Sequence, residues 1–174
     1  PGKYKDKFAL DPWHPEFKLL CVGFSYYSGK NIEAFCVPME HPDSSLDYAV
    51  VREKVKFYLS TTGQKIIGQH VKWDLKALKV HCDIEVRKVH IDTLIGHTLL
   101  TGKKGLGNLE RMSIDYLDAD DVGYKDIIKG HKDAEVTIQP LEDLSEMNMK
   151  DCVKTLELAT VFEGQLRDVA LENY

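Results

Sequence analysis

The aspartates are the residues of this sequence that most directly suggest chemistry. Asp74 stands one turn into a predicted helix that follows a short buried strand, and Asp151 stands in a long helical segment with one apolar face. A two-metal site needs several hard oxygen ligands that converge from different parts of a fold. Each aspartate alone also suits a structural role, because Asp74 can complement the positive end of its helix and Asp151 can pair with Lys150 or Lys154. The metal hypothesis therefore depends on the two together.

Other residues with chemical potential have simpler interpretations. Asp92 precedes Thr-Leu at a predicted helix start, which favours an N-cap that accepts backbone N–H bonds. The four cysteines are widely dispersed and form no pair or cluster with zinc-binding spacing. We therefore expect reduced thiols, with Cys21, Cys36 and Cys152 buried as small hydrophobic residues.

The elements that must position these residues are strands first and then mostly helices. The runs 17–27 and 31–39 are apolar and aromatic, and the Ser28-Gly29-Lys30 between them predicts an antiparallel hairpin. Short strands are expected at 65–68 and 86–91, each leading into a helix. A hairpin followed by alternating strands and helices predicts an α/β domain with a mixed sheet flanked by helices on both faces.

The expected helices share apolar residues at spacings of three and four. They cover 45–60, begun by an Asp43-Ser44-Ser45 cap, then 71–81, 94–100, 106–117, 122–129, 141–150 and 151 to about 171. The segment 118–140 is the only loop-like stretch and is long enough to form a functional flap.

Composition limits the class of protein. The chain has 174 residues, 43% of them hydrophobic, and 23 Lys+Arg against 28 Asp+Glu for a net charge of −5. This balance argues against binding nucleic acid by bulk electrostatics alone. No apolar run approaches the roughly 20 residues that span a bilayer, so no membrane partner is expected. The N-terminus has no Met and no apolar leader, so we expect one domain over 1–174 cut from a longer polypeptide.

A resemblance to a known family joins these features. The segments that carry it are 9–12 (ALDP) with 19–25 (LLCVGFS), 68–78 (GQHVKWDLKAL), 91–94 (IDTL) with 109–117, and 147–158 (MNMKDCVKTLEL). Their order and spacing resemble the 3′–5′ exonucleases of the DEDD superfamily, especially the proofreading domain of family A DNA polymerases. The resemblance spans nearly the whole chain and implies a ribonuclease H-like fold.

The resemblance also implies a metal site. Family members hold two divalent cations, Mg²⁺ or Mn²⁺, with an Asp-x-Glu on the first strand and one Asp from each of two later motifs. These later aspartates correspond to Asp74 and Asp151. The first motif falls at Tyr4-Lys5-Asp6, where Asp6 is the remaining metal-binding and catalytic candidate and Tyr4 replaces the first carboxylate. Alternatively, a stretch missing between Lys7 and Phe8 leaves the true motif outside this sequence.

Nucleic-acid contacts are implied in the same way. Apolar residues near the cleft would stack on terminal bases, with core packing as the alternative, and a lysine would contact phosphate unless it is simply solvated. A His replaces the Asn of the second motif, and a Met replaces the Tyr that orients the attacking water in the third. The residues assigned to nucleic-acid binding are Leu10, Trp13, His70, Lys72, Trp73 and Met147.

The expected function is proofreading hydrolysis of the 3′-terminal phosphodiester of single-stranded DNA, with a polymerase domain of the same chain as partner. The alternative is a catalytically inactive exonuclease-fold module that supports a polymerase or binds single-stranded DNA. A stand-alone RNA-trimming exonuclease of the same superfamily is a third interpretation. A cytoplasmic replication protein of bacterial or phage origin fits the first two.

Overall fold

Strands alternate with helices in the computed structural model, which describes residues 11–15, 17–61, 63–86, 88–102, 107–117 and 139–172. In these ranges the expected α/β class is confirmed. The elements, in chain order, are β1 (Cys21–Ser28), β2 (Asn31–Pro38), α2 (Tyr48–Thr61), β3 (Ile66–Gly68), α3 (Lys72–Cys82), β4 (Val89–Asp92), α4 (Thr93–Thr101), α5 (Leu109–Leu117) and α7 (Leu141–Glu172).

The predicted hairpin is confirmed. β1 pairs antiparallel with β2, and Gly29 takes a positive φ of 64° in the turn between them, a conformation that glycine adopts without steric cost. The first strand begins at Cys21 rather than at Phe17. Phe17 is instead buried, with its ring against Trp73 and His81 of α3. The segment before β1 is thereby attached to α3.

The four strands form two separate pairs in the part of the chain that the structure describes. β1 and β2 make an antiparallel sheet, and β3 and β4 make a parallel one. The expected antiparallel hairpin and parallel strands are both present, but among these residues they form two two-stranded sheets and are not joined into one mixed sheet. β4 also begins at Val89 instead of residue 86. The free edges of β1 and β3 are available for a further strand, since neither has a second partner among the described residues.

The helices differ from expectation at three places. α5 begins at Leu109 instead of residue 106, and the Asn108 side chain accepts the Arg111 N–H just before it. α2 begins at Tyr48, because the Asp47 carboxylate accepts the N–H groups of Ala49 and Val50 and so caps the helix later than the predicted 43–45 cap. α7 is one continuous helix of 32 residues instead of two helices meeting at Lys150 and Asp151. The predicted helix 122–129 and most of the predicted loop 118–140 lie outside the described residues.

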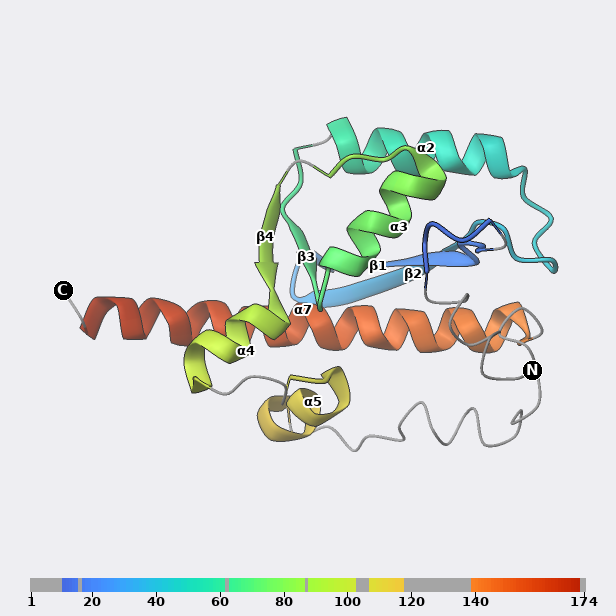
Figure 1. Cartoon of the computed structure of the whole chain (residues 1–174). Helices are drawn as coiled ribbons and strands as arrows, with labels where there is room; N and C mark the ends of the chain where they lie inside the picture. The colour runs from blue at the N-terminus through green and yellow to red at the C-terminus, as the bar shows by residue number, and fades with distance from the viewer. Residues whose placement is uncertain are drawn as a thin grey trace, which may run out of the picture.

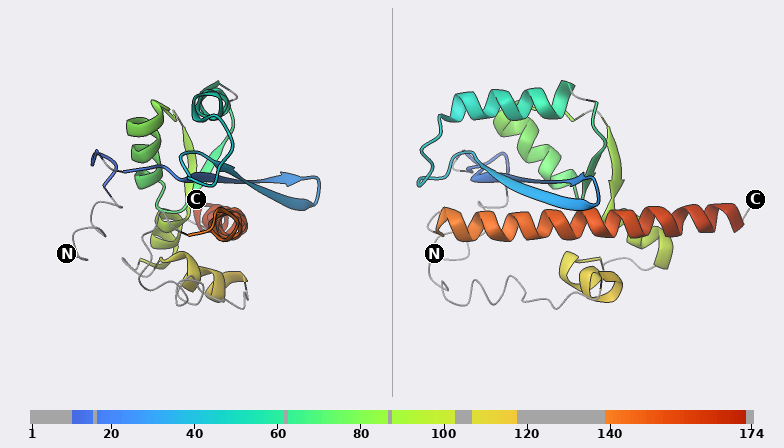
Figure 2. Two further views of the ribbon diagram at one scale, coloured as in Figure 1. Left: turned by 90° about the vertical axis from the view of Figure 1, so that its right-hand side faces the viewer. Right: turned by 180° about the vertical axis from the view of Figure 1, so that it is seen from behind.

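The helices sandwich the hairpin. α2 and α3 lie on one side of β1 and β2, and the long α7 lies on the other (Figures 1 and 2). α4 and α5 pack against α7, with α5 on the side of α7 away from the hairpin (Figure 1). α7 is therefore the element that touches both strand pairs and both of these short helices.

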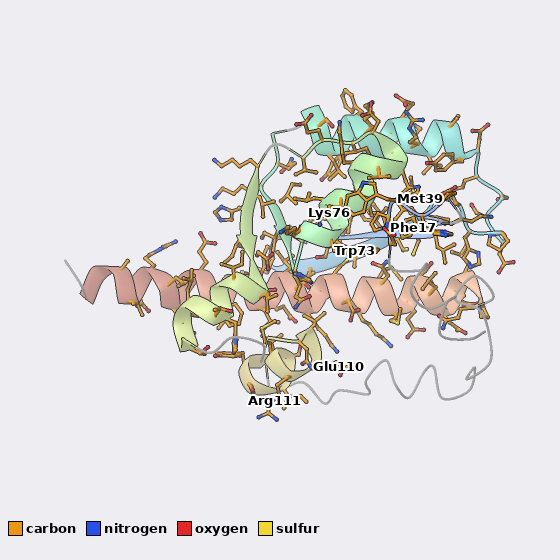
Figure 3. The ribbon with its side chains drawn as sticks, in the orientation of Figure 1. Phe17, Met39, Trp73, Lys76, Glu110 and Arg111 are labelled. Carbon is orange, nitrogen blue, oxygen red and sulfur yellow. The ribbon has the colours of Figure 1, made fainter. Side chains whose placement is uncertain are left out.

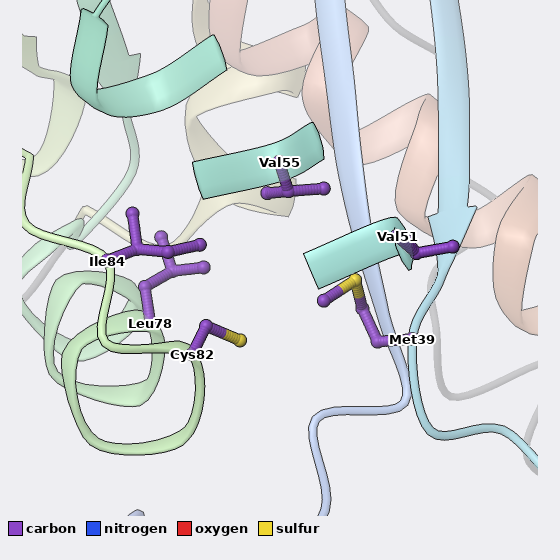
Figure 4. Packing of buried hydrophobic residues seen from close by; sticks show 6 residues of the cluster. All are labelled: Met39, Val51, Val55, Leu78, Cys82 and Ile84. Carbon is purple, nitrogen blue, oxygen red and sulfur yellow. The ribbon is translucent and has the colours of Figure 1, made fainter. Parts of the chain in front are cut away.

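Two apolar clusters hold these layers together. The first lies between α2, α3 and the hairpin and is shown in Figure 4. The second joins α5 to α7 around the fully buried Phe162 and Met112. No helix within the described ranges is long and apolar enough to cross a membrane. The residues of the first cluster are Met39, Val51, Val55, Leu78, Cys82 and Ile84.

Candidate metal centre

A pocket of about 570 Å³ lies between β1, β3, α3 and α7. Asp74 reaches it from the first turn of α3, and Asp151 reaches it from the middle of α7. Two carboxylates that are 77 positions apart in the sequence thus line one cavity (151 − 74). Acidic side chains that line one cavity from different elements are candidates for holding a cation.

Asp74 sits where a negative charge is disfavoured. The residue is exposed, but it lines the pocket. The pocket walls therefore remove part of the water around its carboxylate without enclosing it. This desolvation is the main reason that the pKa of Asp74 is raised to about 6; His70 opposes the rise and Asp92 adds to it. A cation bound at Asp74 would offset the cost of ionising it.

Asp92 sets the position of the turn that presents Asp74. Its carboxylate accepts the Leu94 N–H at 3.0 Å, which confirms the predicted N-cap of α4. It also accepts the N–H groups of His70 at 3.0 Å and Val71 at 3.1 Å, in the turn from β3 to α3. That turn includes a left-handed backbone at His70, with φ 53°, which is uncommon outside glycine. Asp92 therefore joins β4 and α4 to the start of α3.

Asp151 precedes the half-buried Cys152, and the charges of both aspartates affect the pKa of this thiol. The Cys152 carbonyl accepts a hydrogen bond from the Ser25 hydroxyl of β1 at 2.8 Å, which fixes this part of α7 on the hairpin. The pKa of Cys152 is raised to about 12, by desolvation first and then by Asp151, Cys36 and Asp74. Both aspartates therefore lie near enough to the Cys152 thiol to disfavour its thiolate form. Sequence reasoning assigned Cys152 to packing alone and missed its place on the pocket.

The donors present match Mg²⁺ or Mn²⁺ in kind, since both cations prefer carboxylate oxygens. Asp74 and Asp151 supply two such groups. Among the described residues there is no group of three His, Cys, Asp or Glu side chains placed to hold a metal ion. Asp6, the third predicted ligand, lies outside the described residues. The two described carboxylates therefore match such a cation in donor chemistry, and they do not by themselves make up a complete set of ligands.

Of the residues predicted to bind nucleic acid, some line the pocket and others do not. Trp73 and Met147 line the pocket beside Asp74 and Asp151. Trp13 is exposed and does not line the pocket. The Lys76 ammonium lies over its ring, 5.2 Å from the ring centre. Trp73 and Lys76 are labelled in Figure 3, on α3. Lys72 and His70 are exposed and do not line the pocket, and Leu10 lies outside the described residues.

The pocket has a second feature that the sequence did not indicate. β1 and β3 both line it, and each has an edge without a strand partner in the described part of the chain. Residues of α3 and α7 line the same pocket. The unpaired N–H and C=O groups of such edges can accept a further extended segment.

Comparisons with known proteins give no family for this chain. No family model matches this sequence, and no curated protein matches it.

Proposed function

We propose that this chain is a 3′–5′ exonuclease domain with a ribonuclease H-like fold, which hydrolyses the terminal phosphodiester of single-stranded DNA with two Mg²⁺ or Mn²⁺ ions. The observation that carries the proposal is the convergence of Asp74 and Asp151 on one pocket from α3 and α7. In the motif resemblance these are the two later metal ligands. The partner in this proposal is the polymerase domain of the same polypeptide.

Four residues in and around the pocket have tasks in the proposed reaction. Asp74 and Asp151 would hold the cations, which when bound would supply a water of lowered pKa and stabilise charge on the leaving 3′ oxygen. Asp92 keeps the start of α3 in place through the His70 and Val71 N–H groups. Trp73 borders the same pocket, where its ring can contact the terminal base.

A third ligand completes the proposed site. Asp6 is our candidate, and it lies outside the described residues. The edges of β1 and β3 support the proposal, because both strands line the pocket and neither has a second strand partner among the described residues. A carboxylate on such a strand would then be well placed to join them.

One observation favours a second candidate, an inactive module that still binds single-stranded DNA. Met147 lines the pocket one helical turn before Asp151, at the position where the family has Tyr. A thioether has no O–H to orient an attacking water. If this contribution is needed, the domain would bind a 3′ end without cleaving it at a useful rate.

The deciding experiment is digestion of a 5′-labelled single-stranded oligonucleotide by the full chain with Mg²⁺ or Mn²⁺. We expect a ladder that shortens from the 3′ end and that disappears with EDTA, with Asp74→Ala and with Asp151→Ala. Asp168→Ala is the matched control, because Asp168 is an exposed aspartate of the same helix that does not line the pocket. Circular dichroism checks that each variant is folded.

A second readout separates the candidates. Titration of Mn²⁺ by calorimetry should show binding that Asp151→Ala weakens at least tenfold and Asp168→Ala leaves unchanged. DNA binding without cleavage by the wild type would favour the inactive module. Cleavage that survives in Asp74→Ala or Asp151→Ala would contradict the assignment of that residue.

A further inference from the structure

Three of the four cysteines come together where the hairpin packs on α7. The strand register pairs Cys36 of β2 with Gly23 of β1, and Cys21 with Pro38. Because side chains alternate between the faces of a strand, Cys21 and Cys36 lie on the same face of the hairpin as diagonal neighbours. This face packs on α7, since an added Cβ at Gly23 would lie 2.8 Å from the Cys152 sulfur. Folding thus places two thiols from different strands side by side.

The sulfurs of Cys21 and Cys36 share a proton, and each also has a donor of its own. The Cys21 thiol donates to Cys36, which is the main reason that the pKa of Cys36 is lowered to about 7, against the effect of burial. The same bond and burial raise the pKa of Cys21. The Ser145 hydroxyl also donates to Cys36, and the Asn148 amide donates to the Cys21 sulfur at 3.4 Å. Above about pH 7 the pair therefore carries one negative charge, with one proton between the two sulfurs.

The spacing of the two cysteines favours an ion between the sulfurs over a disulfide. Diagonal neighbours on paired strands lie roughly 7–8 Å apart, whereas a disulfide joins residues whose Cα atoms are about 4.4–6.8 Å apart. Two metal–thiolate bonds of about 2.3 Å instead hold the sulfurs about 4.6 Å apart, on opposite sides of one ion. Thiols that are already hydrogen-bonded to each other can reach this geometry without movement of the backbone.

Charge and ligand number select the class of ion. A monovalent cation that replaces the shared proton leaves the charge of the pair unchanged, so it adds no buried charge. Thiolates prefer soft ions such as Cu(I). Zn²⁺ in structural sites takes four ligands, and the described residues offer no set of three His, Cys, Asp or Glu side chains for a metal. Cys21 is half-buried and lines the pocket, which gives an ion a path from solvent.

We propose that Cys21 and Cys36 form a two-coordinate site for a soft monovalent cation of the Cu(I) class, which takes the place of the proton between their sulfurs. On binding, that proton passes to solvent and two metal–sulfur bonds form with no change in oxidation state. Ser145 and Asn148 continue to donate to the sulfurs and hold them in place. The site goes beyond the proposed exonuclease function and uses neither of its two carboxylates.

Transfer of Cu(I) to the reduced full chain, in the absence of oxygen, tests the site. The ion is supplied as its coloured complex with bathocuproine disulfonate, so loss of colour measures transfer, and we expect one Cu(I) per chain. Cys21→Ser and Cys36→Ser should each weaken binding about 100-fold, because one thiolate does not make a two-coordinate site. Cys82→Ser is the matched control, since Cys82 is fully buried in the first apolar cluster and should not affect binding.

Protection from alkylation provides a readout on the wild type that needs no substitution. Bound Cu(I) should slow the labelling of Cys21 and Cys36 by iodoacetamide, which peptide mass spectrometry measures residue by residue. Cys152→Ser should leave the affinity nearly unchanged, since two sulfurs complete the site.

Three results would overturn the cation site. The first is wild-type affinity in both Cys21→Ser and Cys36→Ser. The second is a loss in Cys152→Ser as large as in those two variants, because the ion would then need a third thiolate. The third is rapid formation of a Cys21–Cys36 disulfide by oxidised glutathione, because the two thiols would then be a redox pair within disulfide reach.

Discussion

Asp74 illustrates how a single residue can carry a cost that a ligand would offset. Its pKa is raised to about 6 because the pocket walls desolvate it, and Asp92 adds a second negative charge nearby. A carboxylate in such a place is typical of functional sites, where stability is given up for a charge that is needed. At neutral pH and without metal, the folded protein therefore holds an unfavourable charge.

The pH dependence follows from the direction of this shift. Between about pH 4 and pH 6 the folded state keeps a proton on Asp74 that the unfolded chain has lost, so this group's contribution to stability falls as the pH rises through that window. Asp74→Asn should therefore raise the free energy of unfolding at pH 7 and not at pH 4. Since Asp74 is exposed, solvent screening limits the gain to about 1 kcal/mol at most.

Urea denaturation in EDTA at the two pH values measures this difference. Asp168→Asn provides the reference for removal of an exposed charge from α7. A gain for Asp74→Asn that is the same at both pH values would show that the carboxylate is not held in its neutral form by the pocket.

At the scale of elements, Asp92 holds together the two turns that surround the pocket. One carboxylate accepts the N–H of Leu94 at the start of α4 and those of His70 and Val71 at the start of α3. α3 has no side-chain cap of its own. Asp92 therefore acts in place of an N-cap for α3, because it accepts N–H groups at the start of that helix from the neighbouring parallel strand.

Removal of Asp92 should cost more than an ordinary N-cap. We expect Asp92→Ala to lower the free energy of unfolding by about 2 kcal/mol or more, because a cap worth about 1 kcal/mol is lost together with two further acceptors. Asp92→Ser keeps a cap for Leu94 but cannot reach all three donors, so its loss should be smaller. Urea midpoints compare the two variants. Equal losses would mean that the bonds to His70 and Val71 contribute little.

At the scale of the whole molecule, the seating of the hairpin on α7 decides the shape of the pocket. Gly23 of β1 faces Asn148 and Cys152 so closely that an added Cβ would lie 1.8 Å from Asn148 Oδ1 and 2.8 Å from Cys152 Sγ. Only a residue without a side chain allows this approach. The contact joins the first strand of the described chain to its last helix, and it sets the distance between β1 and Asp151.

Gly23→Ala should push the hairpin away from α7. We expect a loss of about 1–3 kcal/mol in the free energy of unfolding, the usual cost of overpacking a close contact. Asn148→Ala in the same chain removes the closest atoms, so the double variant should lose less than the sum of the two single losses. Additive losses in a double-mutant cycle would contradict direct contact at this site.

Features determined over a few residues could be predicted from the sequence. The hairpin turn at Gly29 and the N-cap at Asp92 depend on neighbours within about four positions, so residue type and spacing were sufficient for both. Helix ends were less certain, because Asp47 and the 43–45 segment offer similar capping groups and only the finished chain shows which one is used.

The local sequence pattern also could not decide whether one helix or two follow residue 140. The residues around Lys150 and Asp151 are compatible with either interpretation, and packing of a single long helix against both strand pairs favours continuity. Separation of the strands into two pairs is a similar case. It depends on which edges meet in space, and the alternation of apolar residues does not carry that information.

The sequence by itself determined the α/β class, most elements and the two candidate carboxylates. Tertiary structure alone decided that Asp74 and Asp151 line one pocket and that both act on the pKa of Cys152. The physical reason is range. Hydrogen bonds and side-chain periodicity act within a few residues and are written in the sequence, whereas the convergence of distant side chains follows from how whole elements pack.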